Sequence, residues 1–284
     1  MHKINKNSKV VLNNGVEMPI IGLGTFKSAE GEQVVHEVGW ALEAGYRLID
    51  TAKIYGNEEG VGRAIKDSGI PREEIFVTTK LWNTDQGYES ALLAIDESLK
   101  KLGMSYVDLY LVHWPTASAD TKESLNKRQD TWRAMEEIYR SGKARAIGVS
   151  NYMIPHLDEM KKYATVVPAV NQVEFHPFLY QKELLNYCNK GGIALQAYSP
   201  LLHGEKLGDE RISNVAQKYG KTNAQILIRW SLQHGCSPIP KSVRKERIEN
   251  NIDVFNFEIA DEDMEVLDGL NEDLHVRANP YLLK

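Results

Sequence analysis

Eight short apolar runs alternate with segments of helical periodicity along nearly the whole chain, and this alternation constrains the fold more than any other feature. Apolar runs with few polar interruptions are typical of strands buried on both faces, as in parallel sheets. Strands that alternate with helices predict βαβ units. The expected strands are 20–23, 47–49, 76–79, 109–112, 146–149, 169–173, 194–197 and 236–239.

The segments between these runs repeat their apolar residues at the helical period of about 3.6 residues. The expected helices are 32–44, 58–68, 88–102, 129–141, 153–162, 181–190, 209–219 and 223–234, with a further one at 244–250. Eight strand–helix units in 284 residues suit one (β/α)8 barrel, which typically needs about 250 residues. We therefore predict an α/β chain with a single domain, residues 1–284, folded as a TIM barrel.

An open, doubly wound sheet is the alternative arrangement of the same elements. Its dinucleotide-binding fingerprint needs three glycines at the first strand–helix turn. Gly22 and Gly24 are present there without a third glycine, which favours the barrel. Residues 115–130 and 201–208 are the expected long loops at the rim, and the tail after Leu270 is short and polar.

The N-terminal segment predicts a β-hairpin that precedes the barrel. Residues 9–18 have β-prone flanks around Asn14-Gly15, a pair typical of a type I′ turn. We expect two antiparallel strands joined at this pair.

Composition and charge exclude several classes of function. The net charge of −5 does not favour a nucleic-acid surface, and no run approaches the roughly 20 apolar residues of a membrane span. The first residues lack the apolar stretch of a signal peptide. Cys188 and Cys236 have no metal-like spacing, so we expect buried thiols in a reducing compartment. We expect a cytoplasmic monomer without nucleic-acid or membrane partners.

Three successive apolar runs end on residues with ionisable side chains. Asp50, Lys80 and His113 end the second, third and fourth runs, and Tyr55 follows Asp50 by five residues. Barrel active sites lie at the carboxyl ends of the strands, and neighbouring strands are about 4.8 Å apart. The sequence therefore predicts that these four side chains meet at one rim.

Each of the four residue types suits proton transfer to a carbonyl oxygen. A tyrosine with a pKa near 10 is protonated at neutral pH and can serve as an acid. A Lys80 ammonium about 4 Å away would favour the phenolate of Tyr55 by about 4 kcal/mol, which lowers its pKa. Asp50 would hold Lys80, and His113 would orient the substrate oxygen. A structural ion pair, a loop tyrosine and a packed loop histidine are the alternatives.

Polar side chains at later strand ends are candidates for binding a planar polar group. Ser150, Asn151 and Gln172 offer hydroxyl and amide groups, and Tyr198 offers a ring for stacking. Loop and capping hydrogen bonds explain the same residues equally well. Asn57 is expected to cap the helix that follows it, without a chemical role.

Two further groups lie at the rim. Glu174 and His176 have metal-like spacing, but no other ligand pattern supports them, and we predict no metal site. Lys241, Ser242 and Arg247 follow the eighth strand, where this fold often binds phosphate at the start of a helix. A solvated basic helix face is the alternative there.

Three segments, 45–62, 143–152 and 239–248, resemble the aldo-keto reductase family. The resemblance implies reduction of aldehydes and ketones with NADPH, with Tyr55 as the general acid and Asp50, Lys80 and His113 as its partners. The substrate-binding residues that it implies are Phe26, Trp82, His113 and Trp114. The cofactor-binding residues that it implies are Gly24, Thr25, Asp50, Ser150, Asn151, Gln172, Tyr198, Ser199, Leu201, Ile239, Lys241, Ser242, Val243, Arg247 and Asn251.

The chain departs from the family pattern at two residues. Asn250 stands where many members carry a glutamate that contacts adenine, and Phe26 stands where several carry tryptophan. The chain is more similar to bacterial members that act on methylglyoxal or 2,5-diketo-D-gluconate, which implies a small carbonyl substrate. A regulatory NADPH-binding module of the same fold and a Schiff-base lyase using Lys80 are the rival functions.

Overall fold

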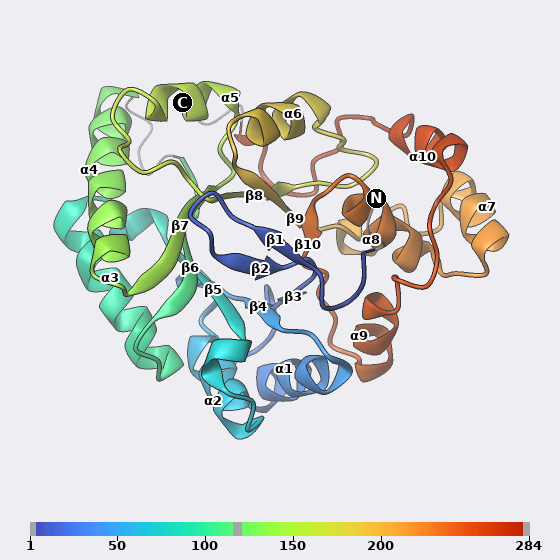
Figure 1. Cartoon of the computed structure of the whole chain (residues 1–284), viewed down its shortest axis with the longest axis horizontal. Coiled ribbons are helices and arrows are strands. Elements are labelled where there is room, and N and C mark those ends of the chain that lie inside the picture. The colour runs from blue at the N-terminus through green and yellow to red at the C-terminus, as the bar shows by residue number, and fades with distance from the viewer. Residues whose placement is uncertain (1–3, 116–120, 281–284) are drawn as a thin grey trace.

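The computed structural model of the chain describes residues 4–115 and 121–280. Eight parallel strands form one curved sheet in chain order, from β3 to β10, with helices around it (Figure 1). This confirms the predicted α/β barrel. The strands are β3 Leu23–Gly24, β4 Leu48–Asp50, β5 Phe76–Leu81, β6 Val107–Val112, β7 Ala144–Ser150, β8 Val170–Glu174, β9 Ala194–Tyr198 and β10 Ser237–Pro238.

Two backbone hydrogen bonds join the last strand to the first and close the ring. The amide of Gly22 donates to the carbonyl of Pro238, and the amide of Gly24 donates to that of Pro240, each at 3.1 Å. We call this joint the seam. Proline has no N–H to donate, so these bonds run in one direction only. A Cβ on Gly24 would lie 2.8 Å from the Ile239 carbonyl oxygen, so the seam requires glycine there.

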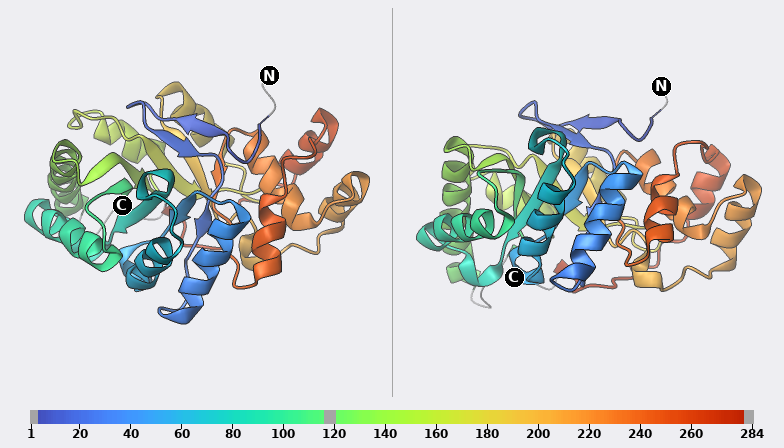
Figure 2. Two further views of the ribbon diagram at one scale, coloured as in Figure 1. Left: turned by 60° about the horizontal axis from the view of Figure 1, so that its bottom comes forward. Right: turned by 90° about the horizontal axis from the view of Figure 1, so that it is seen from below.

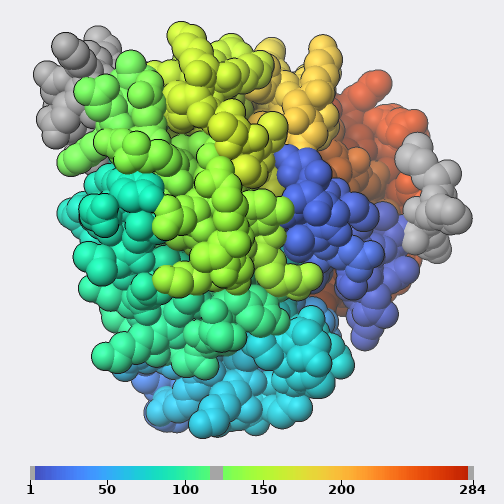
Figure 3. Space-filling model, turned by 60° about the vertical axis from the view of Figure 1, so that its left-hand side comes forward, coloured from blue at the N-terminus to red at the C-terminus, as the bar shows by residue number. Residues whose placement is uncertain are grey.

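Helices cover the outside of the strands in all views (Figures 1 and 2). They are α1 Glu32–Ala44, α2 Glu58–Asp67, α3 Tyr88–Leu102, α4 Thr121–Arg140, α5 Ile154–Met160, α6 Lys182–Lys190, α7 Glu210–Tyr219, α8 Asn223–Gln233, α9 Lys245–Ile252 and α10 Asp261–Asp268. In the space-filling view, teal and green segments form one flank beside the blue N-terminal segment (Figure 3). No helix in the described residues is long and apolar enough to span a membrane.

Two expectations about the helices are wrong. Helix α4 begins at Thr121, so the expected rim loop 115–130 is helical from that residue on, and 116–120 lie outside the described residues. Residues 121–128 are mostly polar, which hid the helical period in the sequence. Helix α10 was not predicted at all, because its acidic first turn carries few apolar residues.

The predicted hairpin is present, but its turn is of another type. β1 Lys9–Val11 pairs with β2 Glu17–Pro19 in antiparallel register. The amide of Leu12 donates to Val16, the amide of Gly15 donates to Leu12, and Gly15 has φ 84°. Asn14 is not among the residues of positive φ, which a type I′ turn requires. The hairpin therefore closes with a three-residue loop that ends on glycine.

The hairpin closes one end of the barrel. Leu12 and Met18 are buried in a cluster inside the barrel that includes Leu48, Leu109 and Ile239. The hairpin lies at one end of the strands in Figure 2. The open end is therefore the one where the strands finish, and any ligand site must lie there.

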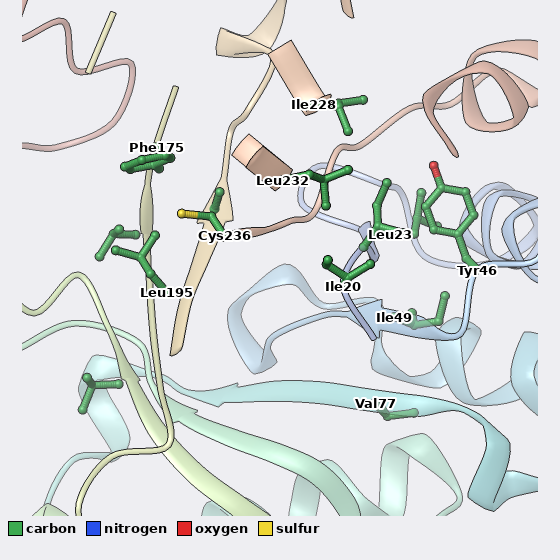
Figure 4. Packing of buried hydrophobic residues seen from close by; sticks show 14 of the residues in the cluster. Ile20, Leu23, Tyr46, Ile49, Val77, Phe175, Leu195, Ile228, Leu232 and Cys236 are labelled. Atoms are coloured by element: carbon green, nitrogen blue, oxygen red, sulfur yellow. The ribbon is translucent and has the colours of Figure 1, made fainter. Parts of the chain in front are cut away.

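A second, larger core fills the space between strands and helices. Figure 4 shows Leu23 of β3 close to Leu232 of α8, and Ile49, Val77 and Ile228 belong to the same buried core. Cys188 and Cys236 are buried there and unpaired, which confirms the expectation of core thiols.

Candidate active site

A cavity of ≈ 980 Å³ lies at the carboxyl ends of the strands. Most of the residues predicted for the site line it, although they come from all parts of the chain. Those residues are Gly24, Phe26, Asp50, Tyr55, Trp82, His113, Trp114, Asn151, Gln172, Tyr198, Ser199, Leu201, Ile239, Lys241, Ser242, Arg247 and Asn251.

Asp50, Lys80 and Tyr55 form a continuous chain of polar contacts. The Lys80 ammonium donates to the Asp50 carboxylate at 2.7 Å, to the Thr51 carbonyl at 2.8 Å and to the Tyr55 hydroxyl at 3.4 Å. The other carboxylate oxygen of Asp50 accepts from the Gln172 amide at 2.7 Å. Lys80 is fully buried, and all its polar neighbours hold it in one position. The prediction that the rim brings these side chains together is thus met by the geometry.

The expected lowering of the Tyr55 pKa is wrong, because burial outweighs the attraction of a nearby ammonium. Burial raises the pKa of Tyr55 well above its usual range, and the nearby Asp50 carboxylate raises it further. Burial also lowers the pKa of Lys80, although the carboxylate of Asp50 opposes that shift. The phenol of Tyr55 is therefore held in its protonated form, as an acid requires.

Aromatic rings surround the Tyr55 hydroxyl on the cavity side. The ring of His113 lies edge-on to the rings of Tyr55 and Trp82, with centroids 5.8 and 5.2 Å away. Phe26 lies 5.1 Å from Tyr55. Burial lowers the pKa of His113 well below its usual value, and Lys80 lowers it further. A neutral imidazole with one N–H follows, suited to donating to an oxygen.

His113 is also fixed by its surroundings. Asn151 donates its side-chain amide to the His113 carbonyl at 2.9 Å, and the Tyr198 hydroxyl donates to Asn151 at 2.8 Å. Within the described residues, Nδ1 of His113 has no hydrogen-bond partner. The hydrogen bonds of Asn151 therefore hold the backbone that carries the imidazole beside Tyr55.

Unpaired cations line the far end of the cavity. Lys241 and Arg247 line it, and in the described part of the chain neither has a carboxylate within 4.0 Å. Ser242 and Asn251 lie beside them in the wall, as does Asn250. Cations without counter-ions at the start of helix α9 fit a phosphate group, because the helix N-terminus adds to their attraction.

Four predicted residues are absent from the cavity wall. Lys80 lies behind Asp50 and Tyr55, and Val243 is 47% exposed to solvent. The Thr25 hydroxyl donates to the Asp50 carbonyl and the Ser150 hydroxyl donates to the Gln172 carbonyl. The side chains of Thr25 and Ser150 thus support the strand ends, and their binding roles stay predictions.

Asn57 stands at the N-cap position of α2, but the expected capping hydrogen bond is absent. Its amide nitrogen donates to the carbonyls of Thr25 and Ser28, and its oxygen accepts from Thr51. Asn57 therefore joins the loops after β3 and β4. The sequence does not reveal this role of Asn57, because those loops meet only in the folded chain.

Several cavity residues escaped the sequence reasoning. Many lie in the loop after β9, at the start of α8 or in the tail, where no strand end marks them. Arg277 lies farthest along the chain from the predicted strand ends, and its charge is the only feature of the tail that could have marked it as a site residue. The missed residues are Lys27, Ile54, Pro200, His203, Gly204, Leu207, Thr222, Asn223, Ala224, Pro240, Arg244, Glu246 and Arg277.

The fold and the cavity define a class: a (β/α)8 barrel with an extended ligand site at the carboxyl rim and a buried Asp–Lys pair behind a tyrosine. The aldo/keto reductase family model matches residues 20–272. Glyoxal reductase of Bacillus subtilis (strain 168) is 52% identical over 271 residues, which cover 95% of each chain. The chain therefore belongs to the aldo/keto reductase family, as its motifs predicted.

Solved structures agree. An aldo-keto reductase from a Medee basin deep-sea metagenome library matches with a TM-score of 0.90 and 49% identity, over 95% of this chain and 97% of that one. The Bombyx mori aldo-keto reductase, solved in complex with NADP, matches with a TM-score of 0.88 and 37% identity, over 97% and 96%. The barrel fold is thus shared over nearly the full length.

Proposed function

We propose that this chain reduces aldehydes and ketones to alcohols with NADPH. The observation that carries the proposal is the contact chain Asp50–Lys80–Tyr55, which ends on a protonated phenol inside the cavity. Similarity to a glyoxal reductase and to a structure solved with NADP supports both the reaction and the cofactor.

Tyr55 donates its proton to the substrate oxygen as that oxygen gains negative charge. The Lys80 ammonium, 3.4 Å from the phenolic oxygen, stabilises the phenolate that remains. Asp50 keeps that ammonium in place, and His113 donates its N–H to the same substrate oxygen. The carbonyl carbon would receive its hydride from NADPH when that cofactor is bound.

The cavity residues also support the choice of cofactor. We propose that Asn151 and Gln172 hold the carboxamide and that Tyr198 stacks on the nicotinamide ring. Lys241, Ser242 and Arg247 would hold the adenosine 2′-phosphate, which favours NADPH over NADH. Asn250 lines the same end and takes the place of the family's glutamate beside adenine.

The aromatic pocket of Phe26, Trp82, His113 and Trp114 suits small carbonyl compounds of the methylglyoxal kind. The burial of Lys80 and its three polar contacts argue against a Schiff-base role, because that chemistry needs a neutral lysine facing the substrate. We further propose that residues 1–284 act as a single domain.

The test is a panel of carbonyl compounds, including glyoxal and methylglyoxal, followed by nicotinamide absorbance with NADPH and with NADH. Oxidation of NADPH by several aldehydes, with NADH much less effective, is the expected result. A folded protein that binds NADPH tightly and reduces nothing in the panel would contradict the proposal and support a regulatory module.

A further inference from the structure

Arg277 reaches the catalytic end of the cavity from the C-terminal tail, beyond α10. The tail is held by Glu174, the last residue of β8, whose carboxylate accepts from the amides of Val276 at 2.8 Å and Arg277 at 3.1 Å. Glu174 is 3% exposed and also contacts His176 at 3.0 Å. A buried carboxylate that binds two successive amides fixes the backbone at Arg277.

The guanidinium of Arg277 lies on the substrate side of the site. Its central carbon is 4.5 Å from the centroid of the Phe26 ring, and the same ring lies 5.1 Å from that of Tyr55. The positive charge of Arg277 lowers the pKa of His113, as burial does. The same charge acts to lower the pKa of Tyr55, but burial raises that pKa by more. Arg277 is therefore a near neighbour of the proposed reaction centre.

This guanidinium lacks a counter-ion. Among residues 4–115 and 121–280, no carboxylate lies within 4.0 Å of it, whereas the guanidinium groups of Arg72 and Arg128 each contact one at 2.7 to 2.8 Å. Of the acidic residues that line the cavity, Asp50 is bound to Lys80 and Glu246 belongs to helix α9 at the opposite end. Lys27 adds a second cation, 5.7 Å from the Phe26 ring.

We propose that Arg277 binds a carboxylate of the substrate, so that the preferred substrates are oxo acids, small carbonyl compounds with a carboxylate a few bonds from the carbonyl. The proposal rests on the carbonyl reduction proposed above. A guanidinium presents two parallel N–H groups that match the two oxygens of a carboxylate. Stacking on Phe26 orients the guanidinium plane, which reduces the entropy lost on binding.

The geometry also limits the size of the substrate. Tyr55 and Arg277 both lie beside the single ring of Phe26, so one small molecule can place its carbonyl oxygen at Tyr55 and its carboxylate at Arg277. Trp82 and His113 close the pocket on the other side of Tyr55. Short ω-oxo acids and formylbenzoates meet this requirement, whereas the corresponding esters keep the carbonyl and lose the charge.

The test compares acids with their methyl esters at saturating NADPH: succinic semialdehyde and para-formylbenzoate, each against its ester. We expect the wild-type protein to prefer the acids. Arg277→Met should lower kcat/KM for the acids by about 10- to 100-fold, mainly through KM, and change the esters by less than about threefold. Arg277→Lys should recover part of the lost kcat/KM for the acids, because lysine restores the charge but not the two parallel N–H groups.

Arg133→Met is the matched control, since Arg133 also lies over an aromatic ring, that of Tyr88, but on α4 and outside the cavity. It should leave all four rates unchanged. Equal losses for acids and esters in Arg277→Met would overturn the proposal, as would a wild type without preference. Weaker NADPH binding in that variant, measured by fluorescence quenching, would show Arg277 to be a cofactor ligand instead. Failure to reduce neutral aldehydes and acids alike would refute the proposed reductase function itself.

Discussion

At the scale of single residues, burial controls the Tyr55 hydroxyl, because it raises the pKa of the phenol and keeps the phenol protonated. Asp50, Lys80 and His113 lie at or next to the ends of successive strands, and parallel strands bring their ends to one rim. The pKa of Tyr55 could not be predicted, because it depends on how deeply the hydroxyl is buried rather than on the nearest charge. Arg277 was missed because only the Glu174 contacts bring the tail to the rim.

Tyr55→Phe removes the proposed acid and little else. We expect turnover of aldehydes to fall by about 10²- to 10⁴-fold, the usual contribution of general acid catalysis, with NADPH affinity unchanged. Steady-state kinetics and fluorescence quenching would measure the two effects. Tyr110→Phe is the control, because Tyr110 is buried outside the site and its hydroxyl has no partner in the described residues. Substantial activity in the Tyr55 variant would exclude Tyr55 as the acid.

Arg247→Ala removes one proposed contact to the 2′-phosphate. The KM for NADPH should rise about tenfold, as expected for one lost charge-assisted hydrogen bond, while the KM for NADH stays nearly constant. Lys245→Ala is the control on the same helix, since Lys245 pairs with Glu43 at 2.9 Å and does not line the cavity. Equal changes for both cofactors would show that Arg247 does not read the phosphate.

At the scale of elements, strand positions were more predictable than helix and turn boundaries. The buried strands are apolar on both faces, which leaves a clear signal. Helix α4 starts in a polar stretch, and the hairpin turn depends on which residue takes positive φ, which Asn14-Gly15 alone does not decide. Close contacts between strands cannot be predicted from the sequence, although they require glycine at the positions where two backbones approach each other.

Gly148→Ala tests such a contact between β7 and β8. A Cβ at this position would lie 2.4 Å from the Val170 carbonyl oxygen, so the two strands would have to separate. We expect the free energy of unfolding to fall by about 1–3 kcal/mol, as for other overpacked cores. Urea unfolding would measure it. Gly39→Ala on α1 meets nothing within 4 Å and should instead raise stability by about 0.5–1 kcal/mol. Equal stabilities would refute the close packing.

At the scale of the whole molecule, buried phenols set the response to alkaline pH. Burial raises the pKa of Tyr46, Tyr55, Tyr110, Tyr152 and Tyr198 above the usual value. Burial likewise raises the pKa of the Cys188 thiol to about 11. Above pH 10 the unfolded chain loses protons that the folded chain keeps, so stability must fall as pH rises. The lowered pKa of Lys80 makes stability rise with pH, but this single group is outweighed by the several buried phenols.

We therefore expect the free energy of unfolding to decrease between about pH 9.5 and 11.5, approaching about 1.4 kcal/mol per pH unit for each buried tyrosine. Urea unfolding followed by tryptophan fluorescence would give the slope. Tyr110→Phe should make the slope shallower by about one tyrosine's share. A stability that stays constant through this range would contradict the burial of these hydroxyl groups.

The seam has a consequence for how the molecule opens. The side of the first strand donates both hydrogen bonds of the seam, because Pro238 and Pro240 have no N–H to donate in return. The seam is therefore a weakly bonded joint of the ring. Gly24 lies on one side of the seam, and Lys241 and Ser242 follow the last strand on the other side, all in the cavity wall. A dinucleotide bound along that wall would contact both sides of the seam and so stabilise the closed ring. Amide exchange at Gly22 and Gly24 would then report occupancy directly, and the barrel would be most firmly closed when loaded.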